Sequence, residues 1–390
     1  VARGVLSTYS TPYNDIPTSA YSGNVFVSVI DSKGNESPKV KVKRYVFKSR
    51  RKPSERISLQ FPEDLPLKNT MESIIESENL SLVESCVFPL RLGLKINQVE
   101  SQRKAHTVEL SRYHISKYEI TNADYSRFLN SVYQDGKLIV IESSQDSRLI
   151  KIEYGDYPIY YKRHRPSVFK KDNDGEIVAI PEDAKKPVFV TYYGAVLYCN
   201  WLSKEYNLNP SYDLENMILF DNDEETTNSI SIANGFRLPT EAEWARAAYW
   251  DGQKYWNTAY QADEYSLKRA VFLEDNIMEE CNVEYPMPVG SYDGTDWTVD
   301  SPSPVGCYDM TGNAPEWCQD DYDRKFPYRD PLVLENPCGF SFQEKPGERK
   351  KAVRGINYSP FADPSPEESS RTGFSMDVDS FVGFRVVVPW

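Results

Sequence analysis

Residues 303–323, SPVGCYDMTGNAPEWCQDDYD, gather side chains that could do chemistry. Two carboxylates, Asp309 and Glu316, flank a Gly-Asn turn, and Trp317 directly follows the second. Carboxylates grouped on a turn can bind a hard cation, or they can belong to an active site as acid and base. They can also form an acidic turn that lies in solvent. The residues by themselves leave all three interpretations open.

Cysteine and histidine offer little for a transition-metal site. The chain has three histidines and six cysteines without a Cys-x-x-Cys pair, so neither a zinc site nor a histidine-rich centre is expected. The cysteines are Cys86, Cys199, Cys281, Cys307, Cys318 and Cys338. Cys281 and Cys338 could pair in an oxidising compartment, and their positions in the sequence do not decide it.

The composition is that of an acidic globular chain. Of its 390 residues, 40% are hydrophobic, which is enough for a sizeable core in one or two domains. The net charge of −13 argues against a nucleic-acid partner. The segment from Lys41 to Arg56 is a basic exception, interpreted as a solvated linker or, alternatively, as a docking segment for an acidic partner or membrane surface. No apolar run approaches the ~20 residues that a membrane helix needs, so no membrane span is expected.

The first 48 residues predict a β-sandwich-like segment. Residues 24–31 (NVFVSVID) and 39–47 (KVKVKRYVF) alternate apolar and polar side chains around a turn, SKGNESP. This hairpin resembles the last strands of a fibronectin type III-like module. Residues 49–80 are interpreted as a charged linker with a short helix at MESIIESE, and residues 81–390 as a second domain.

Three longer helices are predicted in the second domain, over residues 121–133, 191–206 and 238–248. Thr121 can cap the first, and Thr240 with Glu243 forms a capping box at the third. The expected buried positions of the first two helices are Tyr125, Phe128, Leu129, Val132, Val196, Cys199, Trp201 and Leu202. Between these two helices lies an insertion, residues 134–186, whose Asp-Gly and Asn-Asp-Gly turns predict added hairpins.

Six segments in order resemble the formylglycine-generating enzyme (sulfatase-modifying factor) family. They are YHISKYEITNADYSRFLN, PVFVTYYGAVLYCNWLS, ANGFRLPTEAEWARAA, PVGCYDMTGNAPEWCQD, AVRGINYS and GFRVV, within residues 112–388. The resemblance implies an α+β fold: the family's variant of the C-type-lectin-like fold, with little regular structure. It also implies buried, packed positions for Cys199, Cys307 and Cys318.

The resemblance suggests calcium for the turn at residues 309–316. In the family, a turn of this form binds the ion, so Asp309 and Glu316 would supply side-chain oxygens and Gly312 and Ala314 backbone carbonyls. Ca²⁺ takes six to eight oxygen ligands, which suits such a donor set. A second family site would begin at Asn282 and Val283, but the long loop that should follow is missing, so this site is expected to be lost or rebuilt.

The family's oxidase chemistry is not expected here. Its members hold copper with two cysteines between the Arg-Gly motif and the terminal Gly-Phe-Arg, because soft thiolates bind Cu(I). The last cysteine of this chain is Cys338, upstream of Arg354-Gly355, so no copper is expected. The interpretation is a non-catalytic relative; an active formylglycine-generating oxidase remains the remote alternative.

Two hypotheses for its role stay open. The first is a calcium-stabilised structural or assembly protein outside the cytoplasm of a bacterium (cell surface, periplasm or secreted), which contacts protein partners or copies of itself. The 27 tyrosines favour it, since tyrosine is enriched at interfaces. The second is a module that binds a glycan or peptide in the former substrate cleft. If residues 154–164 are buried against another subunit, assembly is favoured; if they line a cleft beside Tyr358 and Phe361, ligand binding is favoured.

Overall fold

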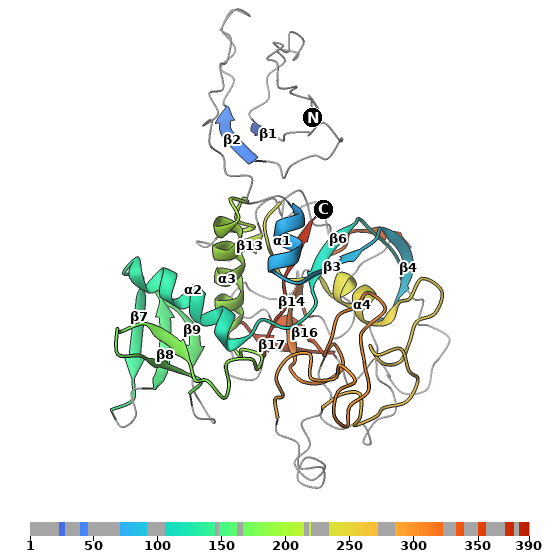
Figure 1. Cartoon of the computed structure of the whole chain (residues 1–390). Helices are drawn as coiled ribbons and strands as arrows, with labels where there is room; N and C mark the ends of the chain where they lie inside the picture. Colours follow the sequence, from blue (N-terminus) through green and yellow to red (C-terminus); the bar gives the residue numbers. More distant parts are fainter. Residues whose placement is uncertain are drawn as a thin grey trace, which may run out of the picture.

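The computed structural model describes thirteen stretches of the chain, which carry four helices and eighteen strands (Figure 1). The described residues are 23–27, 40–45, 71–91, 106–144, 148–161, 167–213, 218–219, 234–271, 285–322, 333–338, 350–355, 371–377 and 382–389. Within these ranges, no helix combines the length and the apolar character needed to cross a bilayer.

The helices are short and begin at capped residues. They are α1 (Met71–Ser77), α2 (Asn122–Gln134), α3 (Tyr192–Glu205) and α4 (Glu241–Tyr249). The side chains of Thr121, Thr191 and Thr240 each accept a hydrogen bond from a backbone N–H of the first turn. Capping boxes close at both α2 and α4, so the predicted helix starts are confirmed. All eight expected buried positions of α2 and α3 are buried.

The strands form seven small sheets. The strands are β1 (Gly23–Val27), β2 (Val40–Tyr45), β3 (Leu80–Val83), β4 (Cys86–Leu90), β5 (His106–Leu110), β6 (Tyr113–Ser116), β7 (Leu138–Glu142), β8 (Leu149–Tyr154), β9 (Tyr157–Tyr161), β10 (Phe169–Lys171), β11 (Ile177–Ala179), β12 (Tyr212–Asp213), β13 (Ile218–Leu219), β14 (Glu316–Asp321), β15 (Val333–Glu335), β16 (Lys350–Arg354), β17 (Arg371–Ser375) and β18 (Val387–Pro389). The three-stranded sheets run β14-β16-β17, β15-β5-β4, β18-β6-β3 and β7-β8-β9. Two-stranded sheets pair β1 with β2, β10 with β11 and β12 with β13.

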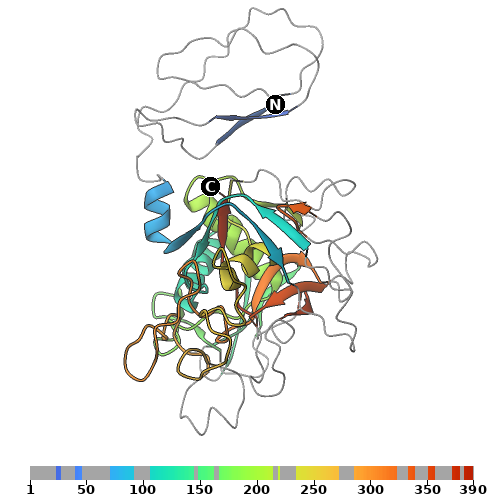
Figure 2. The ribbon, with the colours of Figure 1, turned by 90° about the vertical axis from the view of Figure 1, so that its right-hand side faces the viewer.

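The last strand of the chain returns to the first strands of the second domain (Figure 2). β18 pairs antiparallel with β6, which pairs on its other side with β3. Residues some three hundred positions apart therefore share one sheet, and the domain closes only when its C-terminal motif is in place.

The sheet β14-β16-β17 separates two hydrophobic cores. Successive residues of a strand point to opposite faces, so Trp317 and Val353 join one core while their neighbours Cys318 and Ala352 join the other. The first core contains α2, α3 and the inserted strands; the second contains α4 and strands β4 to β6. This sheet therefore carries side chains from its central positions into both halves of the domain.

The insertion at 134–186 contains the hairpins predicted for it. β7, β8 and β9 form a meander, and β10 and β11 pair across a turn in which Gly175 has a φ of +83°. Within residues 154–164, Ile159 and Tyr160 are buried in the chain's own core, and Tyr157 packs on Tyr193 of α3 with ring centroids 4.8 Å apart. The described part of this segment therefore packs on its own α3, and Tyr358 and Phe361 lie outside the described residues.

The first 80 residues are described only in part. β1 and β2 pair antiparallel where the hairpin was predicted, and α1 lies at the predicted short helix. The remainder of the sandwich-like segment 1–48 and linker residues 49–70 lie outside the described residues.

Four of the five described cysteines are buried. Cys199, Cys307, Cys318 and Cys338 are buried and free, whereas Cys86 is half-buried and free. Burial raises the pKa of all four buried thiols, so they stay protonated. The predicted core positions of Cys199, Cys307 and Cys318 are confirmed, and Cys338 is not in a disulfide; Cys281 lies outside the described residues.

His114 of β6 should make the stability depend on pH. It is 1% exposed, and burial, assisted by the charge of Arg112, lowers its pKa from 6.5 to about 4. Near pH 5 the unfolded chain binds a proton on His114 that the folded chain does not, so stability is lost as the pH falls below about 6.5. We expect His114→Gln to remove roughly 2 kcal/mol of the loss between about pH 7 and pH 5, measured by urea unfolding. An equal loss in both proteins would contradict this assignment.

Candidate functional site

A buried ion pair holds the predicted calcium turn at its C-terminal end. Glu316 and Arg385 are both fully buried. Glu316 accepts hydrogen bonds from Nε and Nη2 of Arg385, each 2.7 Å long, and from Nε1 of Trp244, also 2.7 Å. Burial without partners would be very costly for either charge, so this bidentate geometry is what makes the pair tolerable.

Arg385 uses every donor it has. Besides Glu316, its guanidinium donates to the carbonyl oxygens of Ser116, Lys117 and Tyr308 at 2.8, 3.1 and 2.9 Å. These five bonds match the five N–H groups of arginine. The carbonyl of Tyr308 precedes the turn and Glu316 ends it, so one guanidinium fixes both ends of the segment.

The ion pair limits what Glu316 can give to a metal ion. A carboxylate offers about four lone-pair positions, and Arg385 and Trp244 take three of them. One position on Oε1 remains. The prediction that Glu316 is a calcium ligand stays a prediction, and the carboxylate's main partner here is Arg385.

The backbone of the turn adopts the left-handed conformation that glycine and asparagine tolerate best. Asp309, Gly312 and Asn313 have φ angles of +63°, +92° and +55°. A Cβ at Gly312 would lie 2.1 Å from the carbonyl oxygen of Val271, so only glycine fits there. Oδ2 of Asp309 accepts a 2.6 Å hydrogen bond from the backbone N–H of Gly290, and burial raises the pKa of Asp309 to about 6.

Glu119 is a site residue that sequence reasoning missed. It is 2% exposed, and the charge of Asp309 acts on it. Asn313 donates to Oε1 at 3.2 Å, whereas buried Oε2 has no hydrogen-bond partner. Burial and then the charge of Asp309 raise the pKa of Glu119 well above its usual value. The only sequence signal was a carboxylate between Tyr118 and Ile120, directly before the cap of α2.

The backbone carbonyls predicted as ligands are available. Among the described residues, no donor forms a hydrogen bond with the carbonyl oxygen of Gly312 or Ala314. No three His, Cys, Asp or Glu side chains of the described ranges converge to hold a metal ion. A cation here would therefore combine the carboxylates of Glu119 and Asp309 with main-chain oxygens, a donor set that suits calcium.

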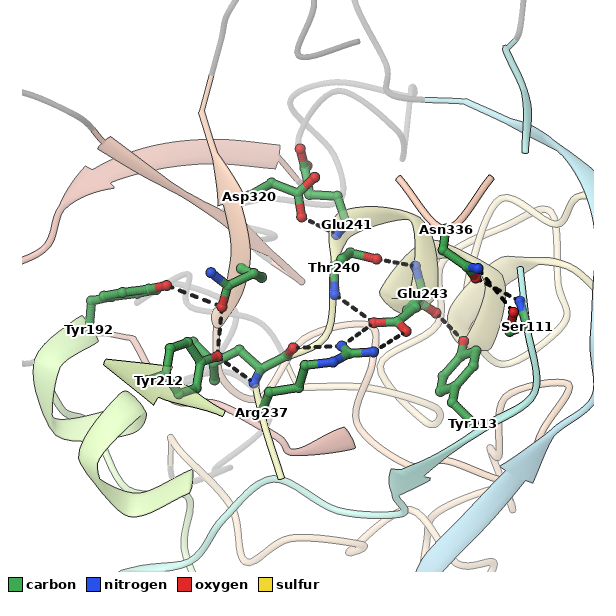
Figure 3. Close-up of polar contacts among 12 residues, drawn as sticks. Ser111, Tyr113, Tyr192, Tyr212, Arg237, Thr240, Glu241, Glu243, Asp320 and Asn336 are labelled. Carbon is green, nitrogen blue, oxygen red and sulfur yellow. Dashed lines mark hydrogen bonds and ion pairs between the residues drawn. The ribbon is translucent and has the colours of Figure 1, made fainter. Parts of the chain in front are cut away.

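A second polar network holds the start of α4 against β6 and the segment at Arg237 (Figure 3). Arg237 forms two bonds to Glu243, at 2.6 and 2.7 Å, and Glu243 also closes the capping box at Thr240. The hydroxyl of Tyr113 donates to the carbonyl of Glu243 at 2.6 Å. These contacts fix the first turn of α4 against β6, where the backbone N–H of Glu243 also donates to Oγ1 of Thr240.

The start of α4 is also tied to the central sheet. The backbone N–H of Glu241 donates to Oδ2 of Asp320 at 2.7 Å, and the Glu241 carboxylate receives two bonds from Arg371, at 2.7 and 2.8 Å. Next to Asp320 on β14, Oε1 of Gln319 accepts hydrogen bonds from the hydroxyls of Tyr212 and Tyr192. These buried charges are paired, which is what a structural role requires.

The weaker predicted site lies outside the described residues. Asn282 and Val283 fall there, as does most of the cysteine-free interval that follows Arg354-Gly355.

The fold and these sites define an α+β domain of small sheets and short capped helices, organised around buried ion pairs. The family described as the Sulfatase-modifying factor enzyme 1-like domain matches residues 80–389. The chain therefore belongs to the formylglycine-generating enzyme (sulfatase-modifying factor) family. The family and fold class predicted from the six motifs are confirmed.

Two curated relatives match parts of the chain. The chaperone protein LppX of Paenibacillus barcinonensis is 33% identical over 148 residues, 33% of this chain and 49% of that protein. The serine/threonine-protein kinase Pkn1 of Chlamydia trachomatis serovar L2 is 26% identical over 238 residues, 60% of this chain and 27% of that protein. The chain thus spans about half of one relative's length and about a quarter of the other's.

Solved structures with a similar fold include three proteins. Treponema denticola variable protein 1 has a TM-score of 0.47 and 20% identity, CarF 0.44 and 20%, and PvdO from Pseudomonas aeruginosa 0.45 and 16%. Each match covers 80% of this chain and 95%, 98% and 94% of the respective structure.

Removing the arginine of the central ion pair should be severely destabilising. We expect Arg385→Met to lower the free energy of unfolding by about 3–5 kcal/mol. The substitution leaves the Glu316 charge buried without its cation and removes the hydrogen-bond donors of three backbone carbonyls. Urea unfolding followed by tryptophan fluorescence measures this. The control is Arg112→Met, which breaks an exposed ion pair with Glu84 and should cost about 1 kcal/mol or less. Equal losses in the two variants would contradict the central role of Arg385.

Proposed function

We propose that the chain is a non-catalytic member of its family that serves as a calcium-stabilised structural or assembly module outside the cytoplasm. The observation that carries this proposal is the buried pair of carboxyl groups of Glu119 and Asp309, with an oxygen of Glu119 that has no partner. The alternative of an active oxidase lacks its thiolates, since no cysteine follows Cys338.

The argument for a cation is electrostatic. After burial, the charge of Asp309 is the largest cause that raises the pKa of Glu119. The two carboxylates are therefore ionised together only with a compensating charge beside them; otherwise one holds a proton. Arg385 fills this role only in part: its charge lowers the pKa of both carboxyl groups, but Glu316 already balances that charge, and the donors of Arg385 are used by Glu316 and three carbonyls. Calcium would neutralise the pair and accept main-chain oxygens of the turn as further ligands.

The argument for a structural role rests on what surrounds the site. The turn is continuous with the central ion pair through Tyr308 and Glu316, so a bound ion would stiffen the junction of β6, β14 and β18. Calcium near millimolar concentration outside cells would keep a site of modest affinity filled. One relative is named a chaperone protein, which agrees with protein partners. The glycan or peptide alternative has no specific contact to support it among the described residues.

Calcium should stabilise the protein through Glu119. At a calcium concentration about one hundred times its dissociation constant, we expect a gain of about 2.7 kcal/mol over the protein in chelator, measured by thermal unfolding. Glu119→Gln should abolish this gain. The same variant should leave the protein in chelator as stable or more stable, because an uncharged amide needs neither the proton nor the cation that the buried carboxyl pair needs.

The matched control is Glu205→Gln, an exposed carboxylate at the end of α3, which should keep the calcium response. Glu316→Gln is a poor test, since it weakens the pair with Arg385 whether or not calcium binds. A parent chain that calcium does not stabilise would refute the calcium site. A Glu119→Gln variant that keeps the full gain would refute its ligand role.

The absence of oxidase activity can be tested directly. We expect no formylglycine product, by mass spectrometry, when the chain is incubated with copper, oxygen and a cysteine-containing peptide. An active family member provides the positive control. Formation of the aldehyde by this chain would overturn the non-catalytic assignment.

A further inference from the structure

Strand β7 of the insertion presents apolar side chains to solvent along a free sheet edge. In the order β7-β8-β9 it is an end strand, and Figure 1 draws it at the margin of the molecule. Ile139 is 55% and Ile141 44% exposed, two of the five large hydrophobic side chains found exposed in the described ranges. Two such residues on one face of one edge strand form a contiguous patch.

The opposite face of β7 belongs to the core, so the strand is held firmly. Leu138 is 9% exposed and Val140 packs against the first core. The register with β8 is continuous from Leu138 to Ile141, and a bulge follows only at Glu142. The exposed isoleucines are therefore presented by an ordered sheet.

The centre of this edge lacks the usual protection against pairing. Natural edge strands are blocked by proline, by inward-pointing charge or by bulges. Residues Ile139, Val140 and Ile141 carry none of these features, and the bulge lies at the strand's end. Among the described residues no other strand pairs with this edge of β7, so its backbone can accept a strand from another chain.

The sequence of the edge is self-complementary, and we propose that β7 pairs with β7 of a second copy of this chain. An antiparallel pair on a two-fold axis through Val140 places Ile139 of each copy opposite Ile141 of the other. Opposed residues of such a pair point to the same face, so four isoleucines form one cluster on the outer face. The two meanders become one six-stranded sheet across an isologous interface.

The neighbouring charges suit this arrangement. Ile139 lies opposite Glu153 of β8 and Ile141 opposite Lys151, and these two charges form an ion pair of 2.6 Å. Across the two-fold axis, each row of the new sheet would run from a glutamate through two isoleucines to a lysine. The patch is therefore neutral locally, although the whole chain carries −13.

The size of the contact sets its strength. Stable interfaces bury about 1,600 Å² in total, more than a five-residue strand pair can supply. The pairing is therefore weak in dilute solution, and it operates where copies are held close together. This inference rests on the proposed assembly role and names the partner as the chain itself.

Sedimentation velocity of the full chain over a wide concentration range tests the pairing. The parent should form a dimer reversibly. Ile141→Lys should weaken association at least tenfold, since it places a lysine ammonium group from each copy in the apolar cluster. The control is Val87→Lys on β4, which is 57% exposed on a different edge strand and should associate like the parent. Unchanged association of Ile141→Lys, or a monomeric parent at all concentrations, would overturn the proposal.

Cysteine crosslinking tests the register independently of affinity. Ile139→Cys and Ile141→Cys should form a disulfide with each other when mixed and oxidised, because directly opposed residues come within bridging distance. Neither should crosslink to itself, since those positions lie about 7–8 Å apart on the diagonal. The parent, with its native cysteines, gives the background. Self-crosslinking as fast as the mixed reaction would refute the two-fold register through Val140.

The outcomes of these experiments can be distinguished from the outcomes that test the calcium proposal. A chain that gains stability from calcium but stays monomeric overturns the β7 pairing only. A dimer disrupted by Ile141→Lys in a chain that ignores calcium overturns the calcium site only.

Discussion

The contact between Arg385 and Glu316 is the constraint on which the rest of the domain depends. Burying the Arg385 guanidinium without partners would be very costly, and five hydrogen bonds satisfy all its donors here. The end of β6, the carbonyl of Tyr308, the start of β14 and the residues before β18 must meet at one point. Two sequence motifs that lie 69 residues apart are thus the two halves of one electrostatic unit.

The same logic recurs at smaller scale around α4. Arg237 with Glu243 and Arg371 with Glu241 are also bidentate and buried. Arg371 joins the helix to β17, and Arg237 joins it to the segment that bridges to Val387 of β18. A domain with small sheets and few long helices has little repetitive hydrogen bonding to define it. Buried ion pairs with fixed geometry help to select the native arrangement of the chain, because a misplaced partner leaves a buried charge unpaired.

Local features of this fold could be predicted from sequence, and non-local pairings could not. The starts of α2 and α4 are set by threonines and carboxylates within four residues, so their capping boxes can be read from the sequence. The Asn-Asp-Gly turn and the Gly312 turn are equally local. No sequence feature near Glu316 predicts that Arg385 is its partner, and none near Asp309 predicts that Glu119 lies beside it. The carboxylate pair depends on residues 190 positions apart that only the closed domain brings together.

The buried thiols provide the protein with its own reporters of opening. Cys199 lies in the first core, and Cys307 and Cys318 lie in the second. Because these thiols are protonated and shielded, an alkylating reagent reaches each of them only when its core opens. The labelling rates of individual cysteines would therefore distinguish the breathing of one core from that of the other, without any engineered probe. The two cores, which a single sheet separates, can therefore open to solvent at different rates.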